Sequence, residues 1–213
     1  MTGELIDCLV PKTSVTYLDN WHSMGMRGTG SGEFTVDDVF VEERFCRDPF
    51  LAMVPHEAYL DRPTFKMLPF NTLACFLGTA QGAIDAFVRA HHRKAAKWGS
   101  ALDRRNRLGR EQSHQMEIAH ADAEIRSTRE WVRGLCERAW EAAVNNQPLD
   151  ADFAVYFWES TIYSCRIAKD AVNRVFDIAG TDSVMQGRGI ERAFRDTHRP
   201  PSAARTADPH CHH

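Results

Sequence analysis

Three long stretches of this chain place apolar side chains at the period of an α-helix, and this pattern constrains the fold more than any other feature. They cover about 70–97, about 111–146, and a third segment that runs from Asp150 or Asp152 to Gly180. Either aspartate can cap the start of the third helix. Helices of this length in a chain of 213 residues pack best as antiparallel neighbours. The sequence therefore predicts a mainly α fold built on an antiparallel helical bundle.

Each stretch also predicts the face that enters the core, because residues at i, i+3 and i+4 share one side of a helix. The first face holds Leu73, Phe76, Leu77, Ala80, Ile84, Phe87 and Val88. The second holds Met116, Ala119, Ala123, Trp131, Leu135, Ala139, Trp140 and Ala143. The third holds Phe153, Phe157, Ile167, Ala171, Val175 and Ile178. We interpret the aromatic side chains among them as packing residues rather than as a cofactor site.

The N-terminal third follows a different pattern, in which short apolar runs alternate with turn residues. Residues 4–10, 14–18 and 33–41 read as strands, and Asp37–Asp38 predicts a tight turn. A short helix is also expected from Ile190 to Thr197. The predicted division is a partial β-domain at 1–48, a linker at 49–69, a C-terminal helical bundle at 70–197 and an irregular tail at 198–213.

Composition narrows the class of protein. With 43% hydrophobic and 26% charged residues, the chain reads as a globular protein with no segment that crosses a membrane. Its net charge of −3 argues against binding to nucleic acid. Six cysteines lie singly, without the close pairs of a zinc ribbon, and no apolar leader precedes them. We expect a cytoplasmic protein with reduced thiols.

Two polar segments are open to a functional interpretation. Residues 25–32 are rich in glycine and can expose backbone amides to a phosphate group, although a structural turn is the simpler explanation. A strand rather than a helix is predicted to follow, which is unlike a dinucleotide-binding loop. Four arginines in the connector after the first helix are either a solvated loop or a clamp for a phosphate group. These are Arg104, Arg105, Arg107 and Arg110.

The histidines do not predict a metal site. His91 and His92 are adjacent, so on a helix their side chains diverge by about 100°. His114 and His120 are six residues apart and also lie on different faces. The terminal run at 210–213 is dense in ligands but falls in the predicted irregular tail, without a fixed geometry.

Four motifs in one order resemble the acyl-CoA dehydrogenase superfamily. Trp21 to Ser31, followed by Val36 to Val41, is similar to the end of that superfamily's β-domain. Leu77 to Ala86 resembles its first C-terminal helix. Gly180-Thr-Asp-Ser and Ile190-Glu-Arg-Ala-Phe-Arg-Asp196 resemble its late glycine motif and its terminal motif. The resemblance implies that the chain is a C-terminal fragment, without the helical domain and flavin loop of a complete member.

The closest branch implied is that of the two-component flavin-dependent monooxygenases. The Y-E-G-T segment of the acyl-CoA dehydrogenases does not follow Asp196, and Asp177 to Thr181 differs from their Q-x-x-G-G motif. This branch implies FAD or FMN, bound as reduced flavin and supplied by a flavin reductase, and a small-molecule substrate. Two alternatives remain open. One is an acyl-CoA dehydrogenase that oxidises the CH–CH bond of a thioester, and the other is a catalytically inactive helical oligomerisation module.

Site residues follow from the same resemblance. In the family, the connector after the first long helix reaches the flavin phosphates of a neighbouring subunit in a homotetramer, which indicates Arg104 and Arg107. The late glycine motif implies that Gly180 and Thr181 allow the pyrophosphate to approach. His198 follows the terminal motif and is the candidate for a catalytic residue near the flavin. The family's continuation of that motif is replaced here by Arg199-Pro-Pro.

Overall fold

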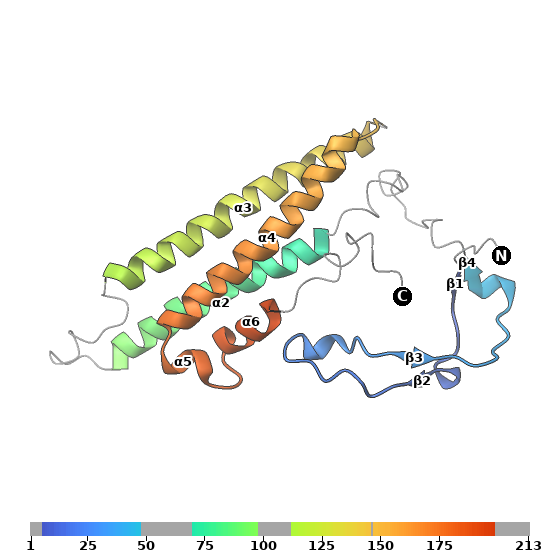
Figure 1. Cartoon of the computed structure of the whole chain (residues 1–213), viewed down its shortest axis with the longest axis horizontal. Coiled ribbons are helices and arrows are strands. Elements are labelled where there is room, and N and C mark those ends of the chain that lie inside the picture. Colours follow the sequence, from blue (N-terminus) through green and yellow to red (C-terminus); the bar gives the residue numbers. More distant parts are fainter. Residues whose placement is uncertain (1–5, 48–69, 98–111, 146, 199–213) are drawn as a thin grey trace, which may run out of the picture.

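The computed structural model describes residues 6–47, 70–97, 112–145 and 147–198, and in them the helices dominate. Three long helices run alongside one another, each antiparallel to the next along the chain (Figure 1). A shorter pair follows them. The helices are α2 (Phe70–Lys97), α3 (Gln112–Val144), α4 (Ala151–Ile178), α5 (Thr181–Val184) and α6 (Gly189–Thr197). The predicted antiparallel bundle is confirmed, and so is the short helix at its end.

Helix α4 is the centre of the bundle because it packs against both α2 and α3, and α6 covers the groove between α2 and α4. The side chains at these contacts form one continuous apolar core. The predicted faces of the first and third stretches enter it, except Val88, which is exposed. Phe153 and Phe157 are the largest fully buried side chains. The bundle therefore buries a core drawn from four helices.

Helix α4 begins where its sequence predicts. The carboxylate of Asp150 accepts a hydrogen bond of 2.7 Å from the backbone N–H of Phe153, so Asp150 is the cap. Farther along, the buried hydroxyls of Ser160 and Thr161 both donate to the carbonyl oxygen of Phe157. These bonds satisfy polar groups in the apolar core without any partner from another helix.

The predicted face of the second stretch is largely wrong. The residues of α3 that are buried are Ala121, Ile125, Thr128, Val132, Ala139 and Ala142. Met116, Trp131 and Trp140 are 40–51% exposed instead. The physical reason is that α3 carries two apolar stripes, and periodicity alone cannot say which one meets the core of its own chain.

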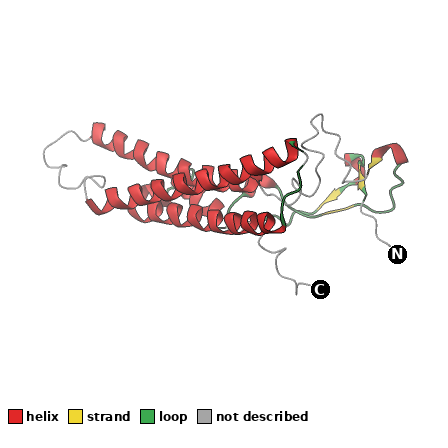
Figure 2. Cartoon of the chain, turned by 90° about the horizontal axis from the view of Figure 1, so that it is seen from above, coloured by secondary structure: helices red, strands yellow, loops and turns green. Residues whose placement is uncertain are grey.

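The N-terminal part contains less β-structure than predicted. Strand β1 (Asp7–Cys8) pairs antiparallel with β4 (Cys46–Arg47), and β2 (Thr16–Tyr17) pairs with β3 (Phe34–Thr35). Asp38 has a φ of +49° at the predicted turn, and β3 ends at Thr35, well before the end of the predicted run at 33–41. Because Tyr17 and Phe34 remain exposed, no packed layer extends these ribbons among the described residues. We call this N-terminal part, residues 6–47, the β segment, and in both views it lies at one end of the bundle (Figures 1 and 2).

Two of the predicted divisions fall largely outside the described residues, namely the linker at 49–69 and the tail after His198. Within the described part, no helix is long and apolar enough to cross a bilayer.

Candidate functional site between the β segment and helix α6

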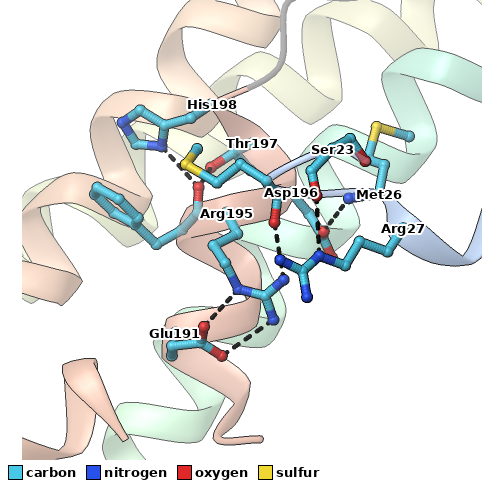
Figure 3. Close-up of polar contacts among 10 residues, drawn as sticks. Ser23, Met26, Arg27, Glu191, Arg195, Asp196, Thr197 and His198 are labelled. Carbon is cyan, nitrogen blue, oxygen red and sulfur yellow. Dashed lines mark hydrogen bonds and ion pairs between the residues drawn. The ribbon is translucent and has the colours of Figure 1, made fainter. Parts of the chain in front are cut away.

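The segment around Gly25 is held on the last turn of α6 by two hydrogen bonds that join distant parts of the chain (Figure 3). The backbone N–H of Met26 donates to Oδ1 of Asp196 at 2.5 Å. In return, Nη1 of Arg195 donates to the carbonyl oxygen of Met24 at 3.0 Å. We call residues 23–29 the docking loop. Two motifs that the sequence analysis singled out separately therefore form one structural unit.

Gly25 is the point of closest approach in this docking. A Cβ atom added to it would lie 1.9 Å from the backbone oxygen of Arg195, which no side chain can tolerate. Met26 then adopts a left-handed conformation with φ at +53°. The hydroxyl of Ser23 donates to the carbonyl oxygen of Gly25 at 2.7 Å, and Nε1 of Trp21 donates to that of Met26 at 3.3 Å. The loop is thus fixed internally as well as against α6.

Arg195 is itself fixed by Glu191, one turn earlier on α6. Its Nε and Nη2 atoms bond the two carboxylate oxygens of Glu191 in a fork geometry, with the Nη2 distance at 3.2 Å. The hydrogen bond from Arg195 lowers the pKa of Glu191 below its ordinary value, and the charges of Arg195 and Arg27 lower it further. The carboxylate therefore stays ionised and holds the guanidinium in place for Met24.

A cavity of about 520 Å³ opens beside the docking loop. Its volume falls within the range of roughly 300–1,000 Å³ that is typical of ligand pockets. The docking loop forms one wall, α2 a second and α6 a third. The lining residues are Met26, Arg27, Gly28, Thr29, Cys75, Phe76, Thr79, Arg192, Arg195, Asp196 and Thr197.

The polar groups of this cavity favour a negatively charged ligand. Arg195 forms an ion pair with Glu191, whereas Arg192 has no ion-pair partner within the described part of the chain. Arg27 uses its Nε atom to donate to the carbonyl oxygen of Ser23 at 2.9 Å, which leaves its terminal nitrogens for a ligand. Phe76 and Met26 supply apolar surface alongside these two arginines. A ligand with a flat apolar part and an anionic part matches this lining.

His198 lies next to the cavity wall but does not line the cavity. Its Nδ1 atom is 2.7 Å from the carbonyl oxygen of Phe194, so in this contact Nδ1 carries the proton and donates it. Its ring packs on Phe194, with the centroids 4.0 Å apart, and Phe194 packs on Phe176. This arrangement fixes the ring and leaves Nε2 as the nitrogen available to a substrate.

Two of the other predicted site residues lie at the turn before α5. Gly180 forms the turn between α4 and α5, and its φ of +60° is a backbone conformation that is sufficient to explain a glycine there. Thr181, the next residue, is exposed. Neither residue lines the cavity next to the docking loop. Arg104 and Arg107 lie outside the described residues.

A second cavity, of about 500 Å³, lies between α2 and α3 and is lined in part by His91, His92 and His114. Within the described ranges, no three histidine, cysteine or carboxylate side chains converge in a way that would hold a metal ion.

Comparison with known proteins places the bundle in a family. Residues 72–200 match the family "Acyl-CoA dehydrogenase, C-terminal domain". The chain belongs to this family. The match covers helices α2 to α6, including the terminal motif that docks the loop at Gly25.

Relatives with named activities are flavin enzymes and hydroxylases. The chain is 29% identical over 202 residues to a pigment production hydroxylase of Rhodococcus sp., covering 88% of this chain and 49% of that protein. It is 24% identical to the flavin-dependent monooxygenase oxygenase subunit HsaA of Rhodococcus jostii, covering 92% and 52%. The chain thus spans about half the length of the curated relatives it matches.

Solved structures share the fold at lower identity. The 3-HSA hydroxylase from Rhodococcus sp. RHA1 superposes with a TM-score of 0.74 at 21% identity, over 91% of this chain and 50% of that one. XiaF from Streptomyces sp., solved in complex with FADH2 and glycerol, superposes with a TM-score of 0.71 at 22% identity, over 95% and 51%. Both bear out the predicted resemblance to the superfamily fold.

Sequence reasoning missed the residues that build the docking site. Gly25 and Asp196 were noted only as parts of motifs, and Arg192 was not singled out. The sequence did contain one signal for this contact. The glycine-rich loop and the R-D motif both belong to the family pattern, and motifs of one family pattern are candidates for contact with each other. Their separation of 170 residues hid this contact from any local pattern.

Proposed function

We propose that the chain is the C-terminal portion of the oxygenase component of a two-component flavin-dependent monooxygenase. The observation that carries the proposal is the named activity of relatives that match about nine-tenths of this chain. In such a reaction, reduced flavin, dioxygen and the substrate C–H group yield oxidised flavin, water and the hydroxylated substrate. A flavin reductase would supply the reduced flavin, and the substrate would be a small aromatic or related molecule.

The cavity beside the docking loop fits part of a flavin or of its substrate. A flavin combines a flat, largely apolar ring system with a phosphate group, and the cavity combines Phe76 and Met26 with Arg27 and Arg192. Bound flavin supplies the redox chemistry, and the protein supplies binding and orientation. In this proposal Arg192 and Arg27 hold the anionic group, which would be a phosphate of either FAD or FMN.

The residues implied by the family resemblance keep their proposed roles. We propose that His198 accepts or donates a proton at Nε2, a role supported by the hydrogen bond that occupies its Nδ1 atom. Gly180 and Thr181 are proposed to lie near the flavin pyrophosphate, and Arg104 and Arg107 to reach the phosphates of a neighbouring subunit. This last role requires the homotetramer. We also propose a cytoplasmic location, in line with five described cysteines that are all free thiols.

Flavin binding by the purified chain tests the proposal. We expect the chain to quench the fluorescence of FMN or FAD at micromolar concentration and to retain flavin through gel filtration. Arg192→Ala should weaken binding about tenfold, because one charge-assisted contact contributes about 1.5 kcal/mol. The matched control is Arg129→Ala, which removes the same side chain from an exposed position on α3. Equal binding by both variants would remove Arg192 from the site.

Hydroxylase activity requires a separate test. The chain would be mixed with a flavin reductase, its nicotinamide cofactor and a panel of small phenols and indoles, and hydroxylated products would be sought by mass spectrometry. Product formation that depends on the chain supports the proposal. Flavin binding without any product would show a cofactor site that needs the remaining half of the protein.

An oligomerisation module is the second candidate, and one observation favours it. Trp131 and Tyr163 are each more than 40% exposed and contact one another edge to face at 5.9 Å across α3 and α4. Large contiguous apolar patches mark association surfaces, and in this proposal the aromatic pair forms part of one. A defined oligomer that binds no flavin at millimolar concentration would favour this candidate over the enzyme. The dehydrogenase alternative is not favoured, because the relatives reported above are monooxygenases and hydroxylases.

A further inference from the structure

Two thiols face one another on the short ribbon at the N-terminal end of the described chain. Cys8 on β1 and Cys46 on β4 are direct cross-strand partners, although they are 38 residues apart in the sequence. Their sulfur atoms are 3.5 Å apart and share a weak hydrogen bond. Both cysteines are free thiols. This pairing requires no side chain from the bundle.

The register of the ribbon suits a bond between the two sulfurs. The N–H of Leu9 donates to the carbonyl oxygen of Phe45 at 2.9 Å, so residues 9 and 45 form the hydrogen-bonded pair. Cys8 and Cys46, one position along, are therefore the non-hydrogen-bonded pair, in which side chains lie closest together. The usual separation of about 4.5 Å between the α-carbons of such a pair falls within the range of roughly 4.4–6.8 Å found in disulfides.

Solvent reaches the pair, in contrast to Cys165 in the core of the bundle. Cys8 is exposed and Cys46 is half-buried, whereas Cys165 is buried in α4. Contact with Cys8, above all its hydrogen bond, raises the pKa of Cys46. Burial raises the pKa of Cys165 to about 11, which makes that thiol inert. Cys75 is exposed on α2 and provides an internal reference for a solvent-accessible thiol without a cysteine beside it in the described structure.

We propose that Cys8 and Cys46 are a modification site, at which hydrogen peroxide forms a reversible disulfide. The thiolate of one cysteine attacks a peroxide oxygen, which gives a sulfenic acid and releases water after proton transfer. The second thiol then attacks the sulfenic sulfur and releases another water molecule. In balance, two thiols and one hydrogen peroxide give one disulfide and two water molecules. A dithiol reductant reverses the bond by thiol–disulfide exchange.

The disulfide would close the segment that carries the docking loop. Residues 8 and 46 lie on either side of Gly25, and Met26 is the residue that bonds Asp196 on α6. Tying the two ends together reduces the conformational freedom of this segment when it is undocked. Oxidation should therefore favour the docked loop over the detached one, without any change in the bundle.

Peptide mapping of the full chain after exposure to hydrogen peroxide tests the proposal. Trypsin separates the two thiols, since Cys8 lies in the peptide 1–12 and Cys46 in the peptide 45–47. We expect these peptides to be recovered joined, with a mass lower by two hydrogen atoms than their sum, and to separate after dithiothreitol. The docking loop should also exchange its amide hydrogens more slowly in the oxidised protein.

Three variants make the outcome decisive. Cys8→Ser and Cys46→Ser should each abolish the joined peptide and the slower exchange, whereas Cys136→Ser, at a half-buried thiol on α3, should leave both unchanged. Recovery of Cys8 and Cys46 as separate sulfinic acids, or joined to Cys75, Cys211 or a second chain, would overturn the proposal. The joined peptide without slower exchange in the docking loop would overturn the effect on docking.

Discussion

The bundle and the β segment are held in place by different forces. In the bundle, Phe153 and Phe157 are almost completely buried in a core shared by four helices. In the β segment, Tyr17, Phe34 and Phe40 are 60–89% exposed, and the segment meets α6 through hydrogen bonds at Met26 and Arg195. Hydrophobic burial is distributed over many side chains, but a polar docking contact depends on a few atoms. Single substitutions should therefore affect the two regions in different ways.

The largest effect is expected in the core of the bundle. Phe157→Ala removes a fully buried ring and should lower the free energy of unfolding by about 3–5 kcal/mol. Urea denaturation followed by helical circular dichroism measures this loss. The matched control is Tyr156→Ala, which removes an aromatic ring that is 54% exposed on the same helix. Similar losses in the two variants would contradict the core described for α4.

The docking loop should be most sensitive at Gly25. In Gly25→Ala the new Cβ would overlap the backbone of Arg195, so the loop must leave α6. We expect docking to weaken by about 3 kcal/mol, at the upper end of overpacking costs, with little change in helical content. Hydrogen exchange at Met26 and proteolysis after Arg27 report the detachment.

The control for this substitution is Gly28→Ala, because nothing lies within 4 Å of a Cβ atom at Gly28. It should behave like the unmodified chain in both measurements. A Gly25→Ala variant that keeps the slow exchange of Met26 would show that the loop does not rest on α6 as described.

Asp196→Ala should weaken docking less than the change at Gly25, by about 2 kcal/mol, because it removes one hydrogen bond to a charged acceptor. Faster exchange of the Met26 amide measures the loss. Asp177→Ala, at an exposed position near the end of α4, removes the same charge away from the contact. If the two variants exchange alike at Met26, Asp196 does not hold the loop.

The sequence predicted the two regions with unequal success, for a physical reason. The three long helices were predicted, and the cap of the third was narrowed to Asp150 or Asp152, because helical period and capping are local properties. The core face of α3 was not, since Met116 and Trp131 lie on a second apolar stripe whose exposure depends on tertiary packing. The β strands were predicted to be too long, because apolar runs such as 33–41 form strands only where another part of the fold covers them. The contact of Gly25 with Arg195 joins opposite ends of the chain, so no local pattern could reveal it.

The smallest effect is expected from the ion pair that supports Arg195. Since contact with Arg195 lowers the pKa of Glu191 in the folded protein, the ionised carboxylate stabilises the fold above its ordinary pKa of 4.5. This contribution is lost as the pH falls through the lower, folded value. Glu191→Gln should therefore cost about 0.5 kcal/mol at pH 7 and nothing once the carboxylate is protonated.

Thermal unfolding of the Glu191→Gln variant and of the unmodified chain, compared at pH 7 and at stepwise lower pH, measures this difference. Glu159→Gln makes the same charge change at an exposed position of α4. This control should have the same thermal stability as the unmodified chain at each pH. Because Arg195 bonds Met24, the loss at Glu191 should also appear as faster exchange in the docking loop at pH 7. A change confined to the bundle would show that the ion pair stabilises α6 alone, and that the loop rests on Asp196 and the fit at Gly25.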